Sequence, residues 1–290
     1  MASAKVRPPL ITVTIVYMTF GTATILEFYR RVMCRKSLYR LNKALYFASL
    51  RGMGIGNWQT QEISGERNFI RSFAGYFESP VILDIGANVG NYSRLIREFN
   101  ADAVIHAFEP HPETFKQLKS VSKQLNVQAF NCAVSDIAGM QKLFDYVPVE
   151  GSHGSEHASL LQNVIENMHG AESASWDVET TTVDQFVEQQ AIRHINLIKI
   201  DVEGNELRVL KGATKTIGKN MVDLIQFEFN ETSMIDRVFL KDFYELLLNY
   251  DFFRMLPDGL VAMGSYVTLL SEIFAYQNIV AKRKDLKCWF

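Results

Sequence analysis

Residues 81–90 read Val-Ile-Leu-Asp-Ile-Gly-Ala-Asn-Val-Gly, and residues 104–110 read Val-Ile-His-Ala-Phe-Glu-Pro. An apolar strand thus runs into a loop that carries two glycines, and one helix length later a second apolar strand ends on Glu109. This order is typical of a nucleotide-binding βαβ unit. Gly86 and Gly90 let the backbone turn sharply and approach a ligand closely, because glycine adopts positive φ without a steric penalty.

The spacing within this loop distinguishes between two classes of cofactor. A dinucleotide pyrophosphate is bound by the pattern G-x-G-x-x-G, whereas Asn88 and Asn91 stand here at the second and third glycine positions. The loop therefore favours S-adenosylmethionine over a nicotinamide dinucleotide. We expect Asp84 to order the loop through hydrogen bonds and Glu109 to bind two ribose hydroxyls. The predicted cofactor-binding residues of this unit are Asp84, Gly86, Ala87, Asn88, Gly90 and Glu109.

The composition is that of an ordinary globular protein. With 290 residues, 48% hydrophobic and 21% charged, the chain can bury the core of one large domain with an appendage. The formal net charge of −2 gives no reason to expect a nucleic-acid partner. Three widely spaced cysteines, Cys34, Cys132 and Cys288, favour a reducing, cytoplasmic compartment over a disulfide framework.

From residue 80 onwards, apolar strands alternate with helical patterns, which predicts an α/β fold with a doubly wound, mostly parallel sheet. Apolar runs at 252–256 and 278–281 predict a reversed final strand. We expect residues 1–65 to form an N-terminal helical extension and residues 66–290 to form the main domain. Strands are expected at 81–85, 104–108, 126–130, 195–200 and 222–229, and helices at 37–50, 66–77, 91–99, 112–124, 205–217 and 240–249.

Residues 10–26 form an uncharged stretch of 17 residues with basic residues on both sides. A membrane span needs roughly 20 apolar residues, and five threonines weaken this stretch further. We therefore favour a peripheral, membrane-associated segment over a single span. If the segment does insert, the heavier positive charge that follows it would keep the main domain in the cytoplasm. A translation start at Met33 is a further alternative.

Residues 146–177 interrupt the alternation and are rich in Gly, Ser, His and Glu. A loop of this length is usually functional or disordered, and this one, with a short helix near 159–168, could fold over a ligand crevice. His153 and His157 have the i,i+4 spacing that binds a metal on a helix, but Gly154 argues against a helix there. We therefore expect solvated histidines, one of which could act as a base, and no metal site.

Further polar residues follow the predicted third strand, at the sheet edge where open α/β folds bind ligands. Ser135 and Asp136 come shortly after the apolar residues 126–130. Asp136 is placed to accept a hydrogen bond from an adenine amino group, so both residues are added to the predicted cofactor site. The alternative is a turn residue ahead of Gly139, because aspartate suits turns well.

Charged residues also occupy the fourth and fifth predicted strands. Lys199, Asp201 and Glu203 alternate and therefore share one face of their strand. Burying charges in so apolar a strand is costly unless they pair or serve a site, which favours a role in catalysis. Glu228, between two phenylalanines, could bind substrate hydroxyls, act as a base or pair with Lys199, and a purely structural role stays open.

Seven short motifs follow one another along the chain: Ser64–Glu66, Asp84–Gly90, Ala107–Pro110, Ala133–Asp136, Thr181–Asp184, Lys199–Glu206 and Gln226–Glu228. Together they resemble the FkbM-type S-adenosylmethionine-dependent methyltransferases, over about residues 52–282. The resemblance implies a seven-stranded, Rossmann-like methyltransferase sheet and methylation of a hydroxyl oxygen on a sugar, glycan or natural product. By position it implies that 84–90 and Glu109 hold the cofactor, that Asp136 holds the adenosine, and that Lys199, Asp201 and Glu203 lie beside the transferred methyl group.

We therefore predict an O-methyltransferase that uses S-adenosylmethionine on a small-molecule or glycan substrate. Asp201 or Glu228 would take or hydrogen-bond the proton of the acceptor hydroxyl. Two alternatives stay open: a non-catalytic cofactor-binding or scaffold protein, and a nicotinamide-dependent oxidoreductase. The carboxylates at the strand ends disfavour the first, and the missing glycines disfavour the second. The predicted catalytic residues are Lys199, Asp201, Glu203 and Glu228.

Overall fold

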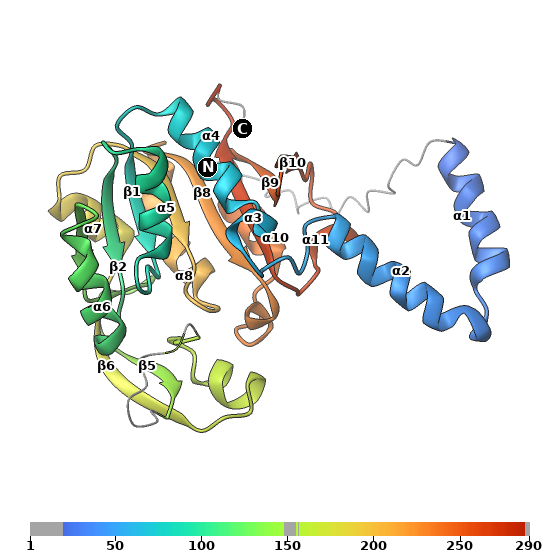
Figure 1. Ribbon diagram of the computed structural model, residues 1–290, viewed down its shortest axis with the longest axis horizontal. Helices are drawn as coiled ribbons and strands as arrows, with labels where there is room; N and C mark the ends of the chain where they lie inside the picture. Colours follow the sequence, from blue (N-terminus) through green and yellow to red (C-terminus); the bar gives the residue numbers. More distant parts are fainter. Residues whose placement is uncertain (1–19, 148–154, 156, 288–290) are drawn as a thin grey trace, which may run out of the picture.

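The computed structural model describes residues 20–147, 155 and 157–287, and an eight-stranded sheet lies at its centre (Figure 1). The strand order is β10-β9-β11-β8-β7-β1-β2-β3. The five strands from β8 to β3 pair in parallel, whereas β11 is antiparallel to both of its neighbours, β8 and β9, and β10 is antiparallel to β9. The strands are β1 (Val81–Ile85), β2 (Val104–Phe108), β3 (Val127–Phe130), β7 (Ile195–Ile200), β8 (Val222–Phe229), β9 (Tyr250–Leu256), β10 (Gly259–Ala262) and β11 (Gln277–Arg283).

The predicted doubly wound, mostly parallel α/β sheet is thus confirmed. The reversed final strand β11 lies between β8 and β9, and the short β10 adds one edge strand to the seven expected. The parallel strands are nearly continuous apolar runs because both of their faces are covered by helices. Their carboxyl ends meet at one edge of the sheet, where polar side chains from successive loops come together.

Helices cover both faces because neighbouring residues of each strand point to opposite sides. Ile82 and Leu197 belong to a core cluster with α4 and α5, whereas Leu83 and Ile198 belong to one with α7, α8, α9 and α10. The helices of the body are α3 (Gln61–Ser64), α4 (Glu66–Tyr76), α5 (Asn91–Phe99), α6 (Pro112–Ser122), α7 (Val183–Gln189), α8 (Glu206–Lys211), α9 (Thr214–Gly218), α10 (Leu240–Leu246) and α11 (Thr268–Ser271).

The single helix expected over 205–217 is wrong, because the structure divides it into α8 and α9. The break follows Gly212, which lies against the segment after β3. A Cβ at Gly212 would stand 2.2 Å from the carbonyl oxygen of Ser135, so only glycine permits this approach. Glycine at the break is thus required by a tertiary contact that helical periodicity does not reveal.

A second, three-stranded sheet forms an arm between β3 and α7, in the order β4-β6-β5. The loop expected over 146–177 is shorter at one end, because a strand begins at Ser173 and pairs with residues 139–146 in a hairpin that buries Leu143 and Val178. The short helix expected near 159–168 is found as a helical turn at Val164–Met168. Figure 1 shows this arm lying beyond the carboxyl ends of the parallel strands. His153 lies outside the described residues. The elements of the arm are β4 (Ala133–Val134), β5 (Gly139–Tyr146), the short helical turn η2 (Val164–Met168) and β6 (Ser173–Thr181).

The N-terminal part of the chain consists of two different segments. The helices α1 (Phe20–Met33) and α2 (Tyr39–Gly52), joined by a 3₁₀ turn (Lys36–Leu38), extend away from the body (Figure 1). Among the residues that the structure describes, no helix combines the length and the hydropathy needed to cross a bilayer. Residues 10–19 of the predicted membrane-associated segment lie outside that range.

The segment that follows α2 packs on the body instead. The N–H of Gly56 donates to the carbonyl of Tyr276 at 2.6 Å. At Gly65, a Cβ would stand 2.3 Å from the carbonyl oxygen of Leu256. The division of the chain at residue 65 stays a prediction, and these contacts favour a boundary closer to the end of α2.

Candidate active site

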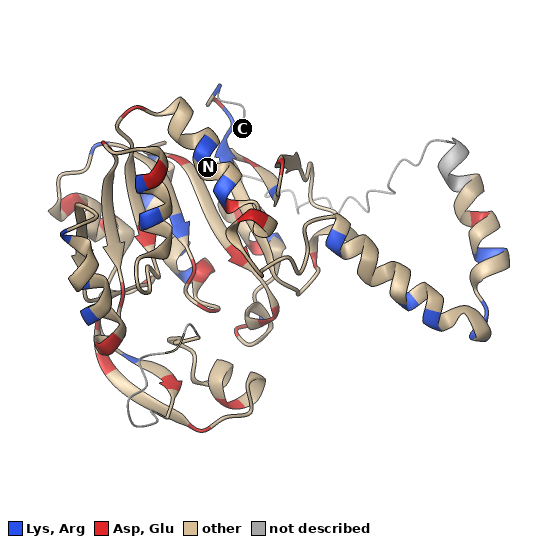
Figure 2. Ribbon diagram, viewed as in Figure 1, with Lys and Arg blue, Asp and Glu red and all other residues tan. Residues whose placement is uncertain are grey.

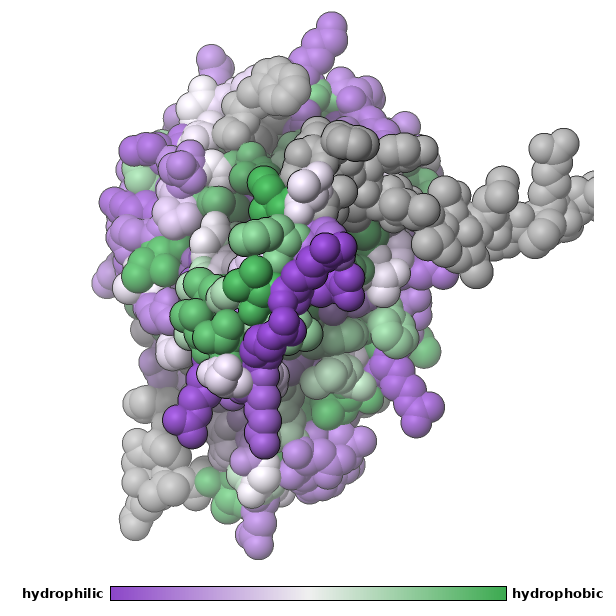
Figure 3. All heavy atoms as spheres, turned by 90° about the vertical axis from the view of Figure 1, so that its right-hand side faces the viewer, coloured by the Kyte–Doolittle hydropathy of each residue, from purple (hydrophilic) through white to green (hydrophobic). Residues whose placement is uncertain are grey.

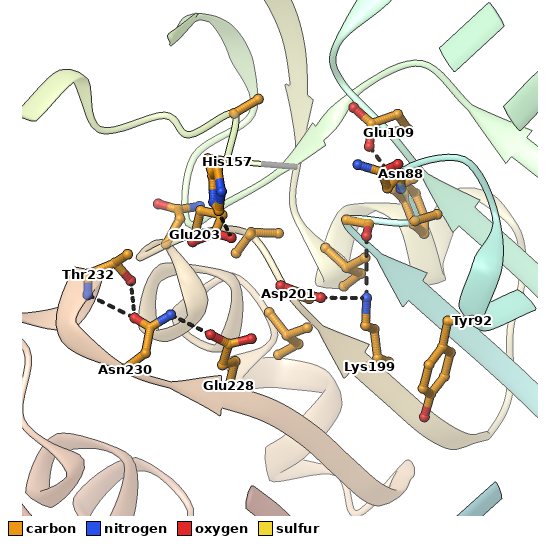
Figure 4. A pocket seen from close by; sticks show the side chains of 18 of the residues that line it. Asn88, Tyr92, Glu109, His157, Lys199, Asp201, Glu203, Glu228, Asn230 and Thr232 are labelled. Atoms are coloured by element: carbon orange, nitrogen blue, oxygen red, sulfur yellow. Dashed lines mark hydrogen bonds and ion pairs between the residues drawn. The ribbon is translucent and has the colours of Figure 1, made fainter. Parts of the chain in front are cut away.

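A cavity of about 480 Å³ opens at the carboxyl ends of the parallel strands (Figure 4). Its walls come from the loops after β1, β2, β7 and β8, from the arm, and from the segment before α4. Two-thirds of the predicted site residues therefore meet in one place. Those that line the cavity are Gly86, Ala87, Asn88, Glu109, Lys199, Asp201, Glu203 and Glu228.

Glycine is required at position 86 because another backbone segment lies against it. The sequence had suggested a different reason, a close approach of the ligand. The φ of Gly86 is +79°, and a Cβ there would lie 1.7 Å from the carbonyl oxygen of Asp201. The N–H of Asp201 donates to the carbonyl of Ile85 at 3.0 Å. The loops after β1 and β7 are therefore fastened to each other. Gly90, with φ +87°, packs against Leu118 and does not line the cavity.

Lys199 joins these two loops through its amine. Its Nζ lies 3.1 Å from Asp201 Oδ2 and 3.7 Å from Asp84 Oδ1, and it donates to the carbonyl of Gly86 at 3.3 Å. Asp84 is fully buried below the loop and accepts a hydrogen bond from Ser93 at 2.7 Å. Burial raises the pKa of Asp84, and the charge of Lys199 opposes this. For Lys199 itself, burial is outweighed by Asp201 and Asp84, so its pKa is raised.

Glu109 presents a fixed carboxylate at the end of β2. Its Oε2 accepts from the N–H of Asn88 at 3.0 Å, and its Oε1 accepts from the N–H of His111 at 2.8 Å. Burial raises the pKa of Glu109 to about 7, although the two N–H donors oppose the shift. Apolar residues continue the wall beside it, namely Phe108, Ala133, Val134 and Leu143.

Ser135 and Asp136 lie next to this wall but do not line the cavity. Ser135 is buried, donates to Asp136 Oδ1 at 3.1 Å and accepts from Asn205 Nδ2 at 3.3 Å. Cys132 to Val134 are the residues of this segment that reach the cavity. The adenine contact of Asp136 stays a prediction.

The arm closes over the loop after β7. Glu203 Oε1 lies 3.5 Å from His157 Nδ1, and the hydroxyl of Ser159 donates to the carbonyl of Glu203 at 2.7 Å. The carboxylate of Glu206 accepts from the N–H groups of Val202 and Gly204, which fixes the turn that carries Glu203. His157 is therefore a residue of the site as well as a partly solvated one. The described residues contain no group of three or more potential ligands placed to hold a metal ion.

Glu228 lies across the cavity from Glu109, with Asp201 between them in Figure 4. It accepts a hydrogen bond from Asn230, whose own oxygen accepts from the N–H of Thr232 at 2.8 Å. Burial, together with the like charge of Asp201, raises the pKa of Glu228 well above its ordinary value. The ion pairs of Lys199 are with the two aspartates described above rather than with Glu228, so that predicted pairing is wrong.

Several lining residues were missed by reasoning from the sequence. Glu66 Oε1 accepts from Gln226 Nε2 at 2.9 Å, and Gln226 Oε1 accepts from the hydroxyl of Tyr92. Glu66 and Gln226 both stand in motifs that carry the family resemblance, which could have pointed to them. Trp58 and Tyr276 have no comparable signal, because they reach the cavity only through the packing of distant segments.

A comparison with known protein families gives a match to this chain. A family model described as the methyltransferase FkbM domain matches residues 84–253, more than half of the chain. The chain belongs to the FkbM methyltransferase family. The predicted family is therefore confirmed, and with it the class of enzyme and the S-adenosylmethionine cofactor that this class uses. Membership of this family excludes the alternative that the chain is a nicotinamide-dependent oxidoreductase.

Three similar proteins are named for methyl transfer. They are the hexuronic acid methyltransferase AglP of Haloferax volcanii (28% identical), the 2-O-methyltransferase NoeI of Sinorhizobium fredii (25%) and the 31-O-demethyl-FK506 methyltransferase FkbM of Streptomyces tacrolimicus (29%). The matches cover 55%, 62% and 55% of this chain. The chain spans 61% of the length of AglP, 76% of NoeI and 69% of FkbM. An O-methyltransferase structure from Bacillus cereus aligns over 89% of this chain and 96% of its own, at 12% identity and a TM-score of 0.40.

Proposed function

We propose that this chain is an S-adenosylmethionine-dependent O-methyltransferase that acts on a hydroxyl group of a sugar, glycan or natural product. The names of the three relatives support this class of acceptor. The observation that carries the proposal is the position of Asp201. Its carboxylate is fixed by Lys199 and lies between Glu109 on one side of the cavity and Glu228 on the other (Figure 4).

The residues around β1 and β2 fit the cofactor. Glu109 is oriented by two backbone N–H groups and has oxygen lone pairs left to accept from ribose hydroxyls. Phe108, Val134 and Leu143 provide an apolar wall beside it for an adenine ring. When bound, S-adenosylmethionine supplies an electrophilic methyl group on its sulfonium. The chain's part is to hold an acceptor oxygen in line with that group and to exclude water.

Asp201 and Glu228 would have different roles with the acceptor. A carboxyl group whose pKa is raised holds its proton and can donate a hydrogen bond, which suits Glu228 for orienting the acceptor. Asp201 is less enclosed, with 42% of its side chain exposed, and its ion pair with Lys199 holds it in place. We therefore assign Asp201 as the group that accepts the proton of the hydroxyl.

Replacing Asp201 by asparagine tests this assignment. We expect kcat to fall about 100-fold or more, because general base catalysis typically contributes that much. Donor affinity, measured by calorimetric titration with S-adenosylmethionine, should stay close to that of the wild type. Asp177→Asn, an exposed carboxylate of the arm, is the matched control. Near-normal turnover in Asp201→Asn would remove Asp201 from the mechanism.

The same titration separates the enzyme from the scaffold alternative. We expect S-adenosylmethionine to bind and this binding to be lost in Glu109→Ala. A folded chain that binds no donor would overturn the proposed function. Donor binding without methyl transfer to any hydroxyl acceptor would support a cofactor-binding scaffold instead.

We further propose that the chain works in the cytoplasm in peripheral contact with a membrane. Residues 20–52 carry seven Lys and Arg residues and a single carboxylate, that of Glu27 (Figure 2). Large apolar side chains are exposed beside them on the same two helices (Figure 3), among them Ile25, Phe28, Tyr39, Tyr46 and Phe47. Cationic and apolar residues together favour an anionic lipid interface. Co-sedimentation with phosphatidylserine vesicles, but not with phosphatidylcholine vesicles, is the expected result.

A further inference from the structure

The side of the cavity that faces away from Glu109 is built by a second set of polar and aromatic side chains, which we call the acceptor-side cluster. Its members come from three parts of the chain that are distant in sequence: the segment around α3 and α4, strand β8, and strand β11. None of them belongs to the loop after β1 or to the end of β2. The cluster consists of Trp58, Gln61, Glu66, Gln226, Glu228, Tyr276 and Asn278.

Hydrogen bonds within the cluster hold its polar atoms in place. Glu66 and Gln226 are joined at 2.9 Å, and Asn278 Nδ2 donates to the hydroxyl of Tyr276 at 3.0 Å. Asn278 is also the partner of Glu228 in the antiparallel pairing of β11 with β8. Amide, hydroxyl and carboxyl groups are therefore presented together by strands β8 and β11, the residue before β11 and the start of α4. Such a mixture of donors and acceptors matches a ligand that bears several hydroxyl groups.

The charge of the cavity is strongly one-sided. Among the described residues that line it, six carry carboxyl groups and only Lys199 carries an amine or guanidinium. That amine is already engaged by Asp201 and Asp84. Burial raises the pKa of both Glu66 and Glu228, although Lys199 opposes the shift at Glu66, so these two carboxyl groups favour the protonated form that donates hydrogen bonds to hydroxyls. An acceptor carboxylate would therefore meet the ion-paired carboxylate of Asp201 and no unengaged lysine or arginine among the described lining residues, whereas hydroxyl groups or an ammonium would meet no such repulsion.

We infer that the acceptor-side cluster binds an uncharged or cationic polyhydroxyl group, such as a neutral hexose or an amino sugar, and rejects acceptors with a carboxylate beside the reacting hydroxyl. The inference rests on the proposed methyl transfer and specifies its substrate. Trp58, a residue that is 64% exposed, offers an apolar ring face to the sugar.

The test compares matched acceptors on the full chain. The panel contains the methyl glycosides of glucose, galactose and mannose, their 2-amino-2-deoxy counterparts and their hexuronic acid counterparts. Transfer from radiolabelled S-adenosylmethionine gives kcat/KM, and saturation-transfer NMR gives binding where no transfer occurs. We expect at least one neutral or amino sugar to exceed its hexuronate by tenfold or more.

Glu66→Gln removes an ionisable group and keeps a side-chain oxygen that can accept from Gln226. We expect this variant to narrow the ratio between the neutral sugar and the hexuronate by about tenfold, which corresponds to about 1.4 kcal/mol. Glu245→Gln, an exposed carboxylate of α10, should leave the ratio unchanged. Calorimetry of the donor verifies that both variants keep a folded cofactor site.

The possible results distinguish a failure of this inference about the acceptor from a failure of the proposed methyltransferase function. A hexuronate that performs as well as its neutral counterpart, or a ratio that Glu66→Gln leaves unchanged, would overturn the inference. Donor binding in the absence of transfer to, or binding of, any neutral or amino sugar would also overturn it. A chain that does not bind the donor at all would instead overturn the proposed function.

Discussion

The cofactor side and the acceptor side of the cavity are built in different ways. Gly86, Asn88 and Glu109 belong to one βαβ unit, and their positions follow from a short stretch of chain. Trp58, Glu66 and Tyr276, in contrast, meet because the segment before α4 packs against the C-terminal strands. A site made by local structure can be recognised from a motif. A site made by long-range packing needs the folded chain.

The largest effect is expected from a substitution at the contact between the loops after β1 and β7, which holds the cofactor side of the cavity in place. In Gly86→Ala, a Cβ would overlap the carbonyl oxygen of Asp201 at 1.7 Å, in a backbone conformation with φ +79° that alanine rarely adopts. We expect the free energy of unfolding to fall by about 3 kcal/mol and donor binding to be lost. Urea denaturation and calorimetry measure the two effects.

Gly75→Ala is the matched control for that substitution. Gly75 lies in α4, and a Cβ there would meet no heavy atom within 4 Å. Alanine should therefore stabilise the chain by about 1 kcal/mol through its helix propensity. If Gly86→Ala were tolerated equally well, the loops after β1 and β7 would not be fastened as described.

A smaller effect is expected at Glu109, with a defined pH dependence. Its pKa is about 7 without ligand, and the ionised form is the one that accepts hydrogen bonds from hydroxyls. Donor binding should lower this pKa, so affinity rises as the pH increases through 7, levels off above it, and is accompanied by proton release. Lys199 and Asp145 also act on Glu109, in opposite directions.

In Glu109→Gln, we expect the affinity for S-adenosylmethionine to fall about 10- to 100-fold and the step near pH 7 to disappear. Calorimetry in buffers with different ionisation enthalpies measures both quantities. Glu113→Gln, an exposed carboxylate at the start of α6, should retain the step. A step that persists in Glu109→Gln would assign the titration to another group.

The smallest effect is expected at the opening of the acceptor side. Trp58→Ala removes a largely exposed ring, so stability should change little. The KM for the acceptor should rise about threefold to tenfold, while the Kd for the donor stays the same. Tyr39→Ala, an exposed aromatic residue of α2, is the control. Equal changes in donor and acceptor binding would mean that the two sides of the cavity are not separate.

The sequence predicted most of the central sheet. Strands β1, β2, β7 and β8 have the expected bounds, because a buried parallel strand must be a continuous apolar run. The strands β5 and β6 were missed, since they form a small sheet in which Leu143 and Val178 are the main buried apolar residues. Their pairing is decided by the partner strand rather than by a strong local pattern.

The same contrast between local patterns and long-range contacts explains which residues of the cavity could be predicted. The sequence by itself determined the βαβ unit, the family and the carboxylates at the strand ends, because these depend on residues close together in the chain. Only the tertiary structure decided that Gly86 serves the loop after β7, that Ser135 and Asp136 stay behind the cavity wall, and that Glu66 enters it. Such positions depend on contacts between segments that are distant in the sequence, and no spacing within one segment encodes them.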